Sequence, residues 1–201
     1  MARRNKPSGF ASHSRALAAA ALLFFLAVGP GVLAQQPQQL NLCVACHGPQ
    51  GNSSNPQIPS LAGQPRIFME NQLVLIREGL RDIPPMKGVL NGLTDTDLTV
   101  LASYFAAQTP LPPVNAVDSA RFERGKVLAR SMLCGTCHLP DYKGREQIPR
   151  LAGQHEPFLR LVMQEYRDHP GPGRDTVMTN ALYGLKDEHL DDLAHFLANF
   201  R

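Results

Sequence analysis

Two copies of the pentapeptide Cys-x-x-Cys-His contain all four cysteines of this 201-residue chain. Their chemically active residues are Cys43, Cys46 and His47 in the first copy and Cys134, Cys137 and His138 in the second. This spacing is the attachment signature of c-type haem. Each thiol forms a thioether to a haem vinyl group, and the adjacent histidine supplies one axial ligand to iron. The pattern therefore predicts two covalently bound haem c groups and an electron-transfer protein.

Other uses of paired cysteines fit the sequence less well. A thioredoxin-like redox site needs a βαβ setting and no following histidine. Structural zinc needs four ligands gathered in one place, whereas these two pairs lie 91 residues apart (134 − 43) and each carries its own histidine. A disulfide framework is typical of exported chains, but it does not explain why a histidine follows both pairs.

The chain contains an internal repeat. Residues 58–64, Ile-Pro-Ser-Leu-Ala-Gly-Gln, return as residues 148–154, Ile-Pro-Arg-Leu-Ala-Gly-Gln, at an offset of 90 (148 − 58). Two haem-binding units are therefore expected, a first domain over 35–108 and a second over 120–201. The segment between them, 109–119, is rich in proline and is expected to form a semi-rigid spacer.

The hydrophobic periodicity favours helices, and no convincing alternating strand pattern is present. Helices are expected over 67–80, 121–133 and 158–168. Thr94 and Asp97 resemble a capping box that begins the last helix of the first unit. One apolar face then follows at i, i+3, i+4 and i+7, and the second unit repeats it. These faces are Leu98, Leu101, Ala102 and Phe105, and Leu190, Leu193, Ala194 and Leu197.

Two methionines occupy matching places in the repeats. Met86 follows His47 by 39 residues (86 − 47), and Met178 follows His138 by 40 (178 − 138). Methionine opposite histidine raises the reduction potential of a haem, so these two are the expected sixth ligands. Pro84-Pro85 favours an extended backbone that presents Met86. The alternative for these two is a core methionine beside haem. Core packing is the expected role of the methionines without a repeat partner, Met69, Met132 and Met163.

The remaining histidines of the mature chain, His155, His169, His189 and His195, have no counterpart in the first repeat, and surface or capping roles are expected for them. His169 is the one that could compete with Met178 for iron. A metal-bound histidine normally donates its other N–H to a carbonyl or carboxylate. Candidates for that contact are the segments around Pro59 and Pro149. Pro59 follows His47 by 12 residues (59 − 47), and Pro149 follows His138 by 11 (149 − 138).

The N-terminus has the features of a secretory signal peptide, 1–34. A basic start without acidic residues precedes a 13-residue apolar stretch, 16–28, and cleavage is expected after Ala34. The stretch is short of the roughly 20 residues of a membrane span, with an uncleaved anchor as the alternative. The mature chain would have 16 basic and 17 acidic residues (20 − 4 and 17), and this balance gives no support to a nucleic-acid partner.

With these motifs in place, the chain resembles the cytochrome c4 family of dihaem class I cytochromes c. The resemblance rests on both Cys-x-x-Cys-His sites, the repeated Pro-x-Leu-Ala-Gly-Gln, Gln72-Leu73, the two methionines, and residues 93–105. It implies an all-α fold of two tandem class I cytochrome c domains, each wrapped around one covalently bound haem. It also implies that the Pro59 and Pro149 carbonyls accept from the axial histidines. Arg81, and with it Arg174, would lie near haem propionates.

Among the departures from the family pattern, one concerns the N-terminal helix and one the second haem motif. If cleavage follows Ala34, only eight residues precede Cys43 (42 − 34), so the N-terminal helix of the first domain would be truncated or absent. The second site also has Leu139 where the first has Gly48. Neither departure removes a ligand.

The expected function is a periplasmic electron carrier, not an enzyme. Electrons would pass from a quinol-oxidising complex or a dehydrogenase to a terminal oxidase, with membrane association only through partners or an uncleaved signal. One alternative is a cytochrome subunit dedicated to a periplasmic dehydrogenase. A dihaem peroxidase would need an iron with an open sixth position, which the paired methionines argue against. A gas or redox sensor would need a signalling domain, and none is seen.

Overall fold

The computed structural model describes residues 1–2, 39–114 and 116–201. The predicted signal peptide therefore lies almost wholly outside the described residues. Within them the fold is all-α, as expected, and pairing of the β type is limited to one isolated bridge between Arg145 and Ile148. No helix in the described ranges combines the length and apolar character needed to cross a membrane.

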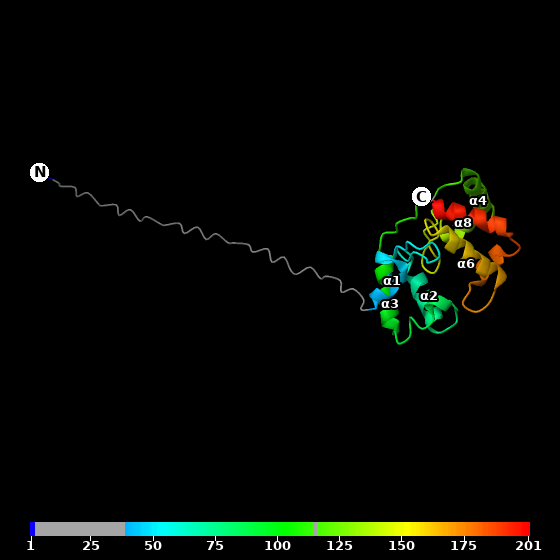
Figure 1. Ribbon diagram of the computed structural model, residues 1–201. Helices are drawn as coiled ribbons and strands as arrows, with labels where there is room; N and C mark the ends of the chain where they lie inside the picture. Colours follow the sequence, from blue (N-terminus) through cyan, green and yellow to red (C-terminus); the bar gives the residue numbers. More distant parts are fainter. Residues whose placement is uncertain (3–38, 115) are drawn as a thin grey trace. The chain divides into compact units, whose positions relative to one another are not determined.

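The first half of the folded chain, residues 39–108, has three α-helices and two short 3₁₀ turns. They are α1 (Leu40–His47), η1 (Pro49–Gly51), α2 (Arg66–Arg77), η2 (Pro84–Met86) and α3 (Asp95–Ala106). The α-helices of this half are labelled in Figure 1. The predicted capping box is confirmed, because the Thr94 side chain accepts from the Asp97 N–H while the Asp97 carboxylate accepts from the Thr94 N–H. This cap fixes the start of α3.

The second half, residues 116–201, has five helices. They are α4 (Ser119–Ser131), α5 (Cys134–His138), α6 (Glu156–Asp168), α7 (Thr176–Leu182) and α8 (Asp187–Asn199). Helix α4 begins two residues earlier than expected because the Asp118 side chain accepts from the backbone N–H groups of Ala120 and Arg121. It ends two residues earlier because Leu133 adopts a left-handed backbone, with φ of 58°.

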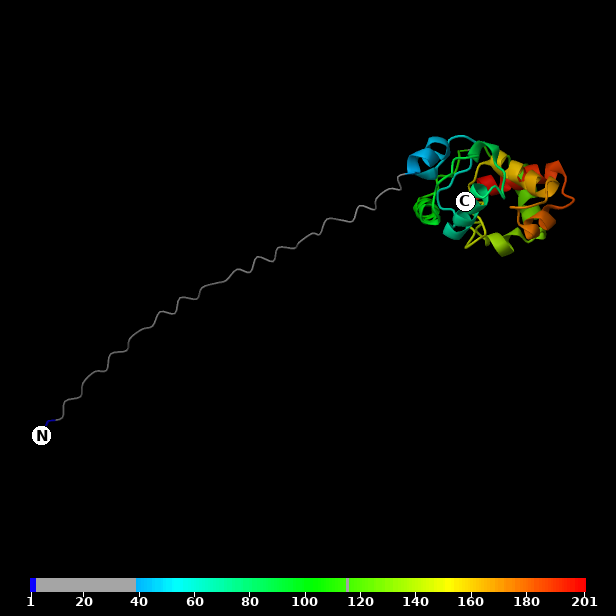
Figure 2. The ribbon, with the colours of Figure 1, turned by 90° about the horizontal axis from the view of Figure 1, so that it is seen from below.

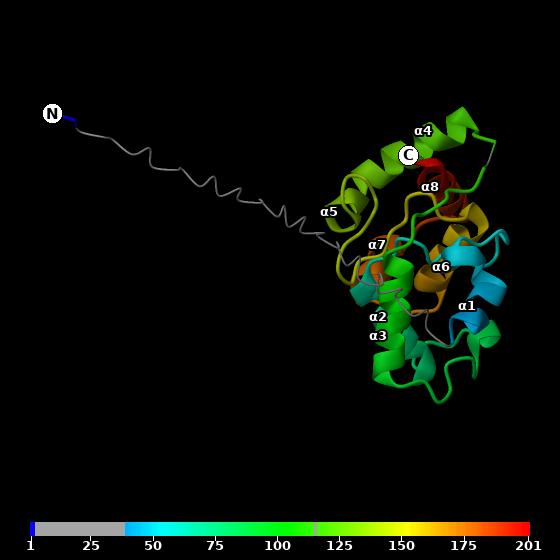
Figure 3. The same cartoon turned by 90° about the vertical axis from the view of Figure 1, so that its left-hand side faces the viewer.

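Each half has its own hydrophobic core, built on the apolar faces of its last helix and of the helix before the methionine. Buried residues of the first core are Leu40, Met69, Leu73, Leu90, Leu98, Leu101, Ala102 and Phe105. In the second core, α8 packs on both α4 and α6 (Figures 2 and 3). All eight residues of the two predicted apolar faces are buried. The core roles of Met69 and Met163 are confirmed, and Met132 packs half-buried on the second core.

A glycine allows the close packing of α4 on α8. A Cβ on Gly125 would lie 2.1 Å from the Asp192 carbonyl oxygen of α8 and 2.6 Å from the Phe196 Cβ. Both distances are far below van der Waals contact, so no other residue fits while the helices keep this separation. The described part of the first half starts at Gln39, just before α1, and the expected truncation of a helix ahead of α1 lies outside the described residues.

The proline-rich segment between the halves makes specific hydrogen bonds. The Asn52 side chain donates to the Thr109 carbonyl at 3.1 Å and accepts from the Leu111 N–H at 2.7 Å. At the far end, the Arg201 guanidinium donates to the Pro113 carbonyl at 3.2 Å. These bonds hold the segment against both halves. The exact domain boundaries stay a prediction.

Candidate functional site

Each Cys-x-x-Cys-His motif forms a helical turn with a buried histidine at its end. His47 closes α1 and His138 closes α5. The His47 Nδ1 lies 2.8 Å from the Pro59 carbonyl oxygen, and the His138 Nδ1 lies 2.9 Å from the Pro149 carbonyl oxygen. Because a carbonyl only accepts, each Nδ1 carries the proton. Each Nε2 is then left with its lone pair, as a metal ligand requires.

The surroundings of both histidines favour the neutral imidazole. Burial lowers the pKa of His47 and of His138, and the hydrogen bond to the proline carbonyl only partly opposes this effect. A ligating histidine must be deprotonated at the coordinating nitrogen. The fold therefore keeps these side chains in the protonation state that a metal ligand needs.

No disulfide joins any of the four cysteines, all of which lie within the described residues. Cys43 and Cys134 are half-buried against the first and second cores, and burial raises the pKa of both thiols. Cys46 and Cys137 are exposed. Among the described residues, no three histidine, cysteine or acidic side chains are gathered as a metal-ion site of their own. This donor set suits thioether attachment and one nitrogen ligand at each site and does not suit structural zinc.

Met86 and Met178 lie against the same cores as the attachment cysteines. Met86 packs on the core that Cys43 contacts, and Met178 packs on the core that Cys134 contacts. The expectation of an extended backbone at Met86 was wrong, because residues 84–86 form the 3₁₀ turn η2. Proline restricts the residue before it, so Ile83 is the extended residue, and the Met86 N–H then donates to the Ile83 carbonyl at 2.8 Å.

Met178 is held differently, inside helix α7. The Asp175 carboxylate caps this helix and accepts from the backbone N–H groups of Val177 at 2.8 Å and Met178 at 3.0 Å. The cap fixes the first turn of α7 and with it the direction of the Met178 side chain. The two repeats therefore present the methionine from different local structures.

An arginine closes each methionine segment, and the sequence reasoning missed both. Arg77, at the end of α2, donates to the Leu93 carbonyl at 3.0 Å and to the Asp95 carboxylate at 2.7 Å. Arg167, near the end of α6, donates to the Leu185 carbonyl at 2.9 Å and to Asp187 at 2.7 Å. The offset of 90 (167 − 77) equals that of the repeated proline segment, and this was the available signal.

The repeated glutamines join the two halves. Gln154 Oε1 accepts from the Ser60 N–H at 2.9 Å, and Gln154 Nε2 donates to the Ser60 carbonyl at 2.8 Å. In the opposite direction, Gln64 Oε1 accepts from the Arg150 N–H at 3.0 Å, and its Nε2 donates to the Arg150 carbonyl at 3.0 Å. The repeated segment thus provides the carbonyl that accepts from the histidine and also forms the contact between the two halves. The sequence did not reveal this second role.

The expected surface roles of His155 and His195 were wrong, because both side chains are buried, at 6% and 2% exposure. His155 Nε2 donates to the Ser53 carbonyl of the first half at 2.9 Å. His195 Nε2 accepts from the Asp118 N–H at 3.0 Å, while its Nδ1 lies 2.7 Å from Glu156. Burial of a polar imidazole ring is compatible with a stable fold when the ring is hydrogen-bonded. His189 does act in a cap, at the start of α8, and His169 is exposed and near Glu165.

Arg81 and Arg174 lie near each other at the contact between the halves. Arg81 donates to the Gln72 side chain, and Arg174 donates to Glu165 at 2.6 Å. Burial lowers the pKa of Arg81, and the positive charge of Arg174 adds to this effect. No carboxylate among the described residues pairs with Arg81. A partly buried cation of this kind is suited to an anionic group of a bound cofactor.

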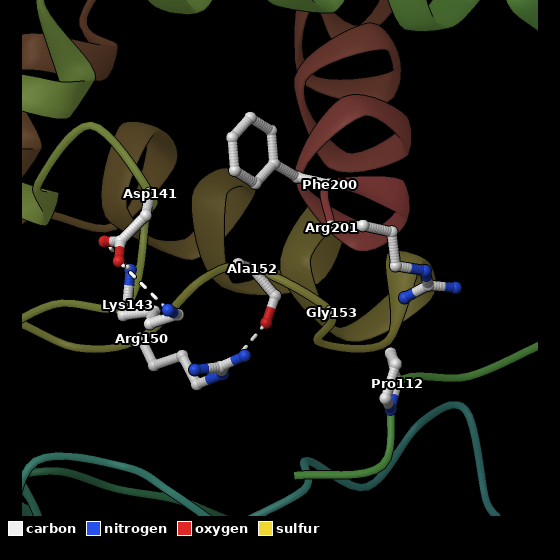
Figure 4. A pocket seen from close by; sticks show the side chains of 8 residues that line it. All are labelled: Pro112, Asp141, Lys143, Arg150, Ala152, Gly153, Phe200 and Arg201. Atoms are coloured by element: carbon white, nitrogen blue, oxygen red, sulfur yellow. Dashed lines mark hydrogen bonds and ion pairs between the residues drawn. The ribbon is translucent and has the colours of Figure 1, made fainter.

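A small cavity of about 160 Å³ opens beside residues 148–154, the second copy of the repeated segment (Figure 4). The Arg150 Nε donates to the Ala152 carbonyl at 3.1 Å, and Lys143 pairs with Asp141 at 3.2 Å. The contact with Ala152 holds the Arg150 side chain along its own loop, while the Arg150 backbone bonds to Gln64. The cavity contains none of the predicted site residues.

Two helical turns of Cys-x-x-Cys-His, each with its histidine held on a proline carbonyl, define a c-type cytochrome with two haem sites. The general cytochrome c family model matches residues 122–201. Cytochrome c4 of Pseudomonas aeruginosa is 34% identical over 71% of this chain and 75% of its own length. The chain belongs to the cytochrome c4 family.

Two further comparisons agree with this assignment. A crystal structure of reduced recombinant cytochrome c4 from Pseudomonas stutzeri has a TM-score of 0.74 and 28% identity, covering 81% of this chain and 96% of that one. A thiosulfate dehydrogenase electron acceptor of Thiomonas intermedia is 28% identical over 92% of this chain and 90% of its own length. The fold of two class I cytochrome c domains, the two covalently bound haem c groups and a role in electron transfer between redox proteins follow at family level.

Proposed function

We propose that this protein is a periplasmic dihaem electron carrier whose irons are ligated by His47 and Met86 and by His138 and Met178. The observation that carries the proposal is the matched pair of sites. Each half presents a buried histidine with its Nδ1 committed to a proline carbonyl. Each half also presents a methionine on the core that the attachment cysteine contacts. Two equally equipped sites favour a carrier over an enzyme, which needs one open iron.

The cysteines, proline carbonyls and methionines have different roles at each proposed haem site. Bound haem c supplies an iron centre that cycles between ferric and ferrous states. Cys43, Cys46, Cys134 and Cys137 anchor the group. The proline carbonyls fix the orientation and tautomer of the axial histidines. The thioether sulfur of each methionine closes the sixth position and raises the reduction potential.

The interface arginines are proposed to receive the haem propionates. Arg81 has a neutral glutamine as its hydrogen-bond partner, and Arg174 lies close enough for its positive charge to add to the lowering of the Arg81 pKa by burial. An ionised propionate would neutralise the positive charge of Arg81, which has no carboxylate partner among the described residues, and would gain charge-assisted hydrogen bonds. The same arrangement would draw both cofactors toward the contact between the halves.

The proposed partners are a quinol-oxidising complex or a dehydrogenase as donor and a terminal oxidase as acceptor. Redox encounters use small interfaces, on the order of 1,200 Å² or less, which suits a carrier that must release each partner quickly. Export is supported by the features of residues 1–34, and an uncleaved signal would leave the protein attached to the membrane.

A carbon monoxide difference spectrum of the fully reduced protein, scaled to haem content, tests this proposal. Carbon monoxide needs an open or weakly held sixth position. The expected result is no binding at either haem in the wild type, and binding at about half of the haem in Met86→Ala and in Met178→Ala. Wild-type binding at half of the haem would overturn the carrier assignment and favour an enzyme.

A second candidate is a dedicated electron acceptor of one dehydrogenase. It is favoured by the similarity to the thiosulfate dehydrogenase electron acceptor of Thiomonas intermedia, which extends over 90% of that protein. Copurification of the native protein from cell extract separates the two. A stable stoichiometric complex with a dehydrogenase subunit supports the dedicated acceptor, and a free monomer that reduces an oxidase supports the carrier.

A further inference from the structure

One peptide group links each axial histidine to the other half of the molecule. The Pro59 carbonyl oxygen accepts from the His47 Nδ1 at 2.8 Å. The N–H of the same peptide group belongs to Ser60, and it donates to the Gln154 Oε1 at 2.9 Å. The chain of contacts therefore runs from the first histidine, through a single amide plane, to a glutamine of the second half.

The second half contains the same arrangement with the roles exchanged. The Pro149 carbonyl accepts from His138 at 2.9 Å, and the N–H of that peptide group, on Arg150, donates to the Gln64 Oε1 at 3.0 Å. Gln64 belongs to the first half. Each half thus provides the glutamine that completes the histidine support of the other.

Both glutamines are shielded from water. Gln154 is 5% exposed and Gln64 is 6% exposed. Each side chain pairs with both the N–H and the carbonyl of one residue across the interface. The doubled contact fixes the amide orientation, since a flipped amide would place donor against donor and acceptor against acceptor. A hydrophobic side chain at either position would leave the peptide N–H without its partner and with little access for water.

Hydrogen bonds at the two ends of an amide reinforce each other. A donor N–H that is engaged by an acceptor polarises its peptide group, and the carbonyl oxygen becomes more negative. The carbonyl then accepts more strongly from the histidine Nδ1–H. A stronger bond at Nδ1 raises the basicity of the nitrogen that faces the metal, and a more basic ligand stabilises ferric over ferrous iron.

We propose that Gln154 and Gln64 are positioning residues that lower the reduction potential of the haem in the opposite half. Gln154 acts on the His47 haem through the Pro59–Ser60 peptide group, and Gln64 acts on the His138 haem through the Pro149–Arg150 peptide group. This inference rests on the proposed histidine ligation. It makes the docked state of the two halves a determinant of both potentials.

The test measures the two midpoint potentials separately in the holoprotein. A redox titration followed by proton NMR distinguishes the haems, because the hyperfine-shifted methyl signals of each haem report its own oxidation. In Gln154→Leu, the potential of the His47 haem is expected to rise while that of the His138 haem stays unchanged. In Gln64→Leu, the pattern is expected to reverse. The crossed pattern is what a merely structural role does not produce.

His155→Leu is the matched control. It removes a buried hydrogen bond between the halves, from His155 Nε2 to the Ser53 carbonyl, and leaves both glutamine contacts in place. It is expected to lower the thermal stability and leave both potentials unchanged. If one glutamine variant fails to incorporate both haems, the other tests the inference by itself, because the two contacts are separate.

Two results would overturn the inference. One is unchanged potentials in a glutamine variant that holds two haems. The other is an equal shift of both haems in each variant, which indicates general loosening of the interface. Carbon monoxide binding to the same samples separates this failure from failure of the proposed ligation. Closed irons with unmoved potentials contradict the role of the glutamines alone, whereas an open iron in the wild type contradicts the ligand assignment.

Discussion

The Arg167 Nη2 lies 2.7 Å from the Asp187 Oδ1, and it ties the end of α6 to the start of α8. The segment between them, 169–186, contains Met178. The same guanidinium also donates to the Leu185 carbonyl at 2.9 Å and to Asp168 at 2.6 Å. One side chain therefore fixes both ends of the segment that carries the proposed iron ligand. The first half repeats the arrangement around Arg77.

Replacing this arginine should loosen the methionine without removing it. In Arg167→Leu we expect carbon monoxide to bind a measurable fraction of the haem in the second half. Complete binding there would correspond to half of the total haem of the protein. The isolated exposed ion pairs contribute little, but loss of the bond to the Leu185 carbonyl frees the backbone itself. Arg66→Leu is the control, since it removes only an exposed ion pair with Glu70 on α2. Wild-type behaviour in Arg167→Leu would show that α7 holds Met178 unaided.

Acid should weaken the same tie. Hydrogen bonds from Arg167 lower the pKa of Asp168 and of Asp187. A carboxyl group with a folded pKa below its unfolded value of about 3.9 contributes stability above that value and loses it as pH falls through the folded pKa. Urea unfolding at a series of pH values below about 4 should therefore show a steeper loss in the wild type than in Arg167→Leu. Parallel curves would contradict this assignment.

Leu139 is strained where its repeat partner is glycine. Its φ and ψ are 69° and 159°, and those of Gly48 are 76° and 169°. Such a backbone costs a side-chain-bearing residue about 1–3 kcal/mol, and glycine costs roughly 0.5–1 kcal/mol in unfolded-state entropy. Leu139→Gly should therefore stabilise the second half by about 1 kcal/mol in urea unfolding.

The reverse change in the first half is the matched comparison. A Cβ on Gly48 would lie 2.1 Å from the Asn52 carbonyl oxygen, so Gly48→Ala is expected to destabilise the first half strongly. If Leu139→Gly lowers the stability, contacts of the leucine side chain outweigh the backbone strain.

His195 should be a stabilising residue of the second half. Its Nε2 accepts from the Asp118 N–H that precedes α4, and its Nδ1 donates to Glu156 on α6. His195→Leu leaves a backbone donor and a carboxylate without this partner, at an expected cost of about 1–3 kcal/mol. Thermal unfolding should show the loss, while the carbon monoxide assay stays unchanged. His189→Leu, which affects only an exposed cap, is expected to cost much less.

The haem sites could be predicted because their information is local. Two thiols and a histidine within five residues specify attachment whatever the rest of the chain does. The helices were also predictable, since α3 and α8 owe their position to an apolar face of regular period and α3 to a capping box. The backbone at Met86 was misjudged because a preference of the residue before proline was applied to the residue after it.

The contacts between distant residues were decided only by the tertiary structure. Gln154 meets Ser60 across 94 residues of sequence, and His155 meets Ser53 across 102. The hydrogen-bond partner of a polar side chain cannot be predicted from sequence periodicity. Burial of His155 and His195 depends on donors and acceptors that folding brings from distant parts of the chain. The sequence by itself determined the cofactor, its attachment and the family. The folded chain decided which groups surround each proposed axial histidine, because packing, and not the order of residues, brings those groups together.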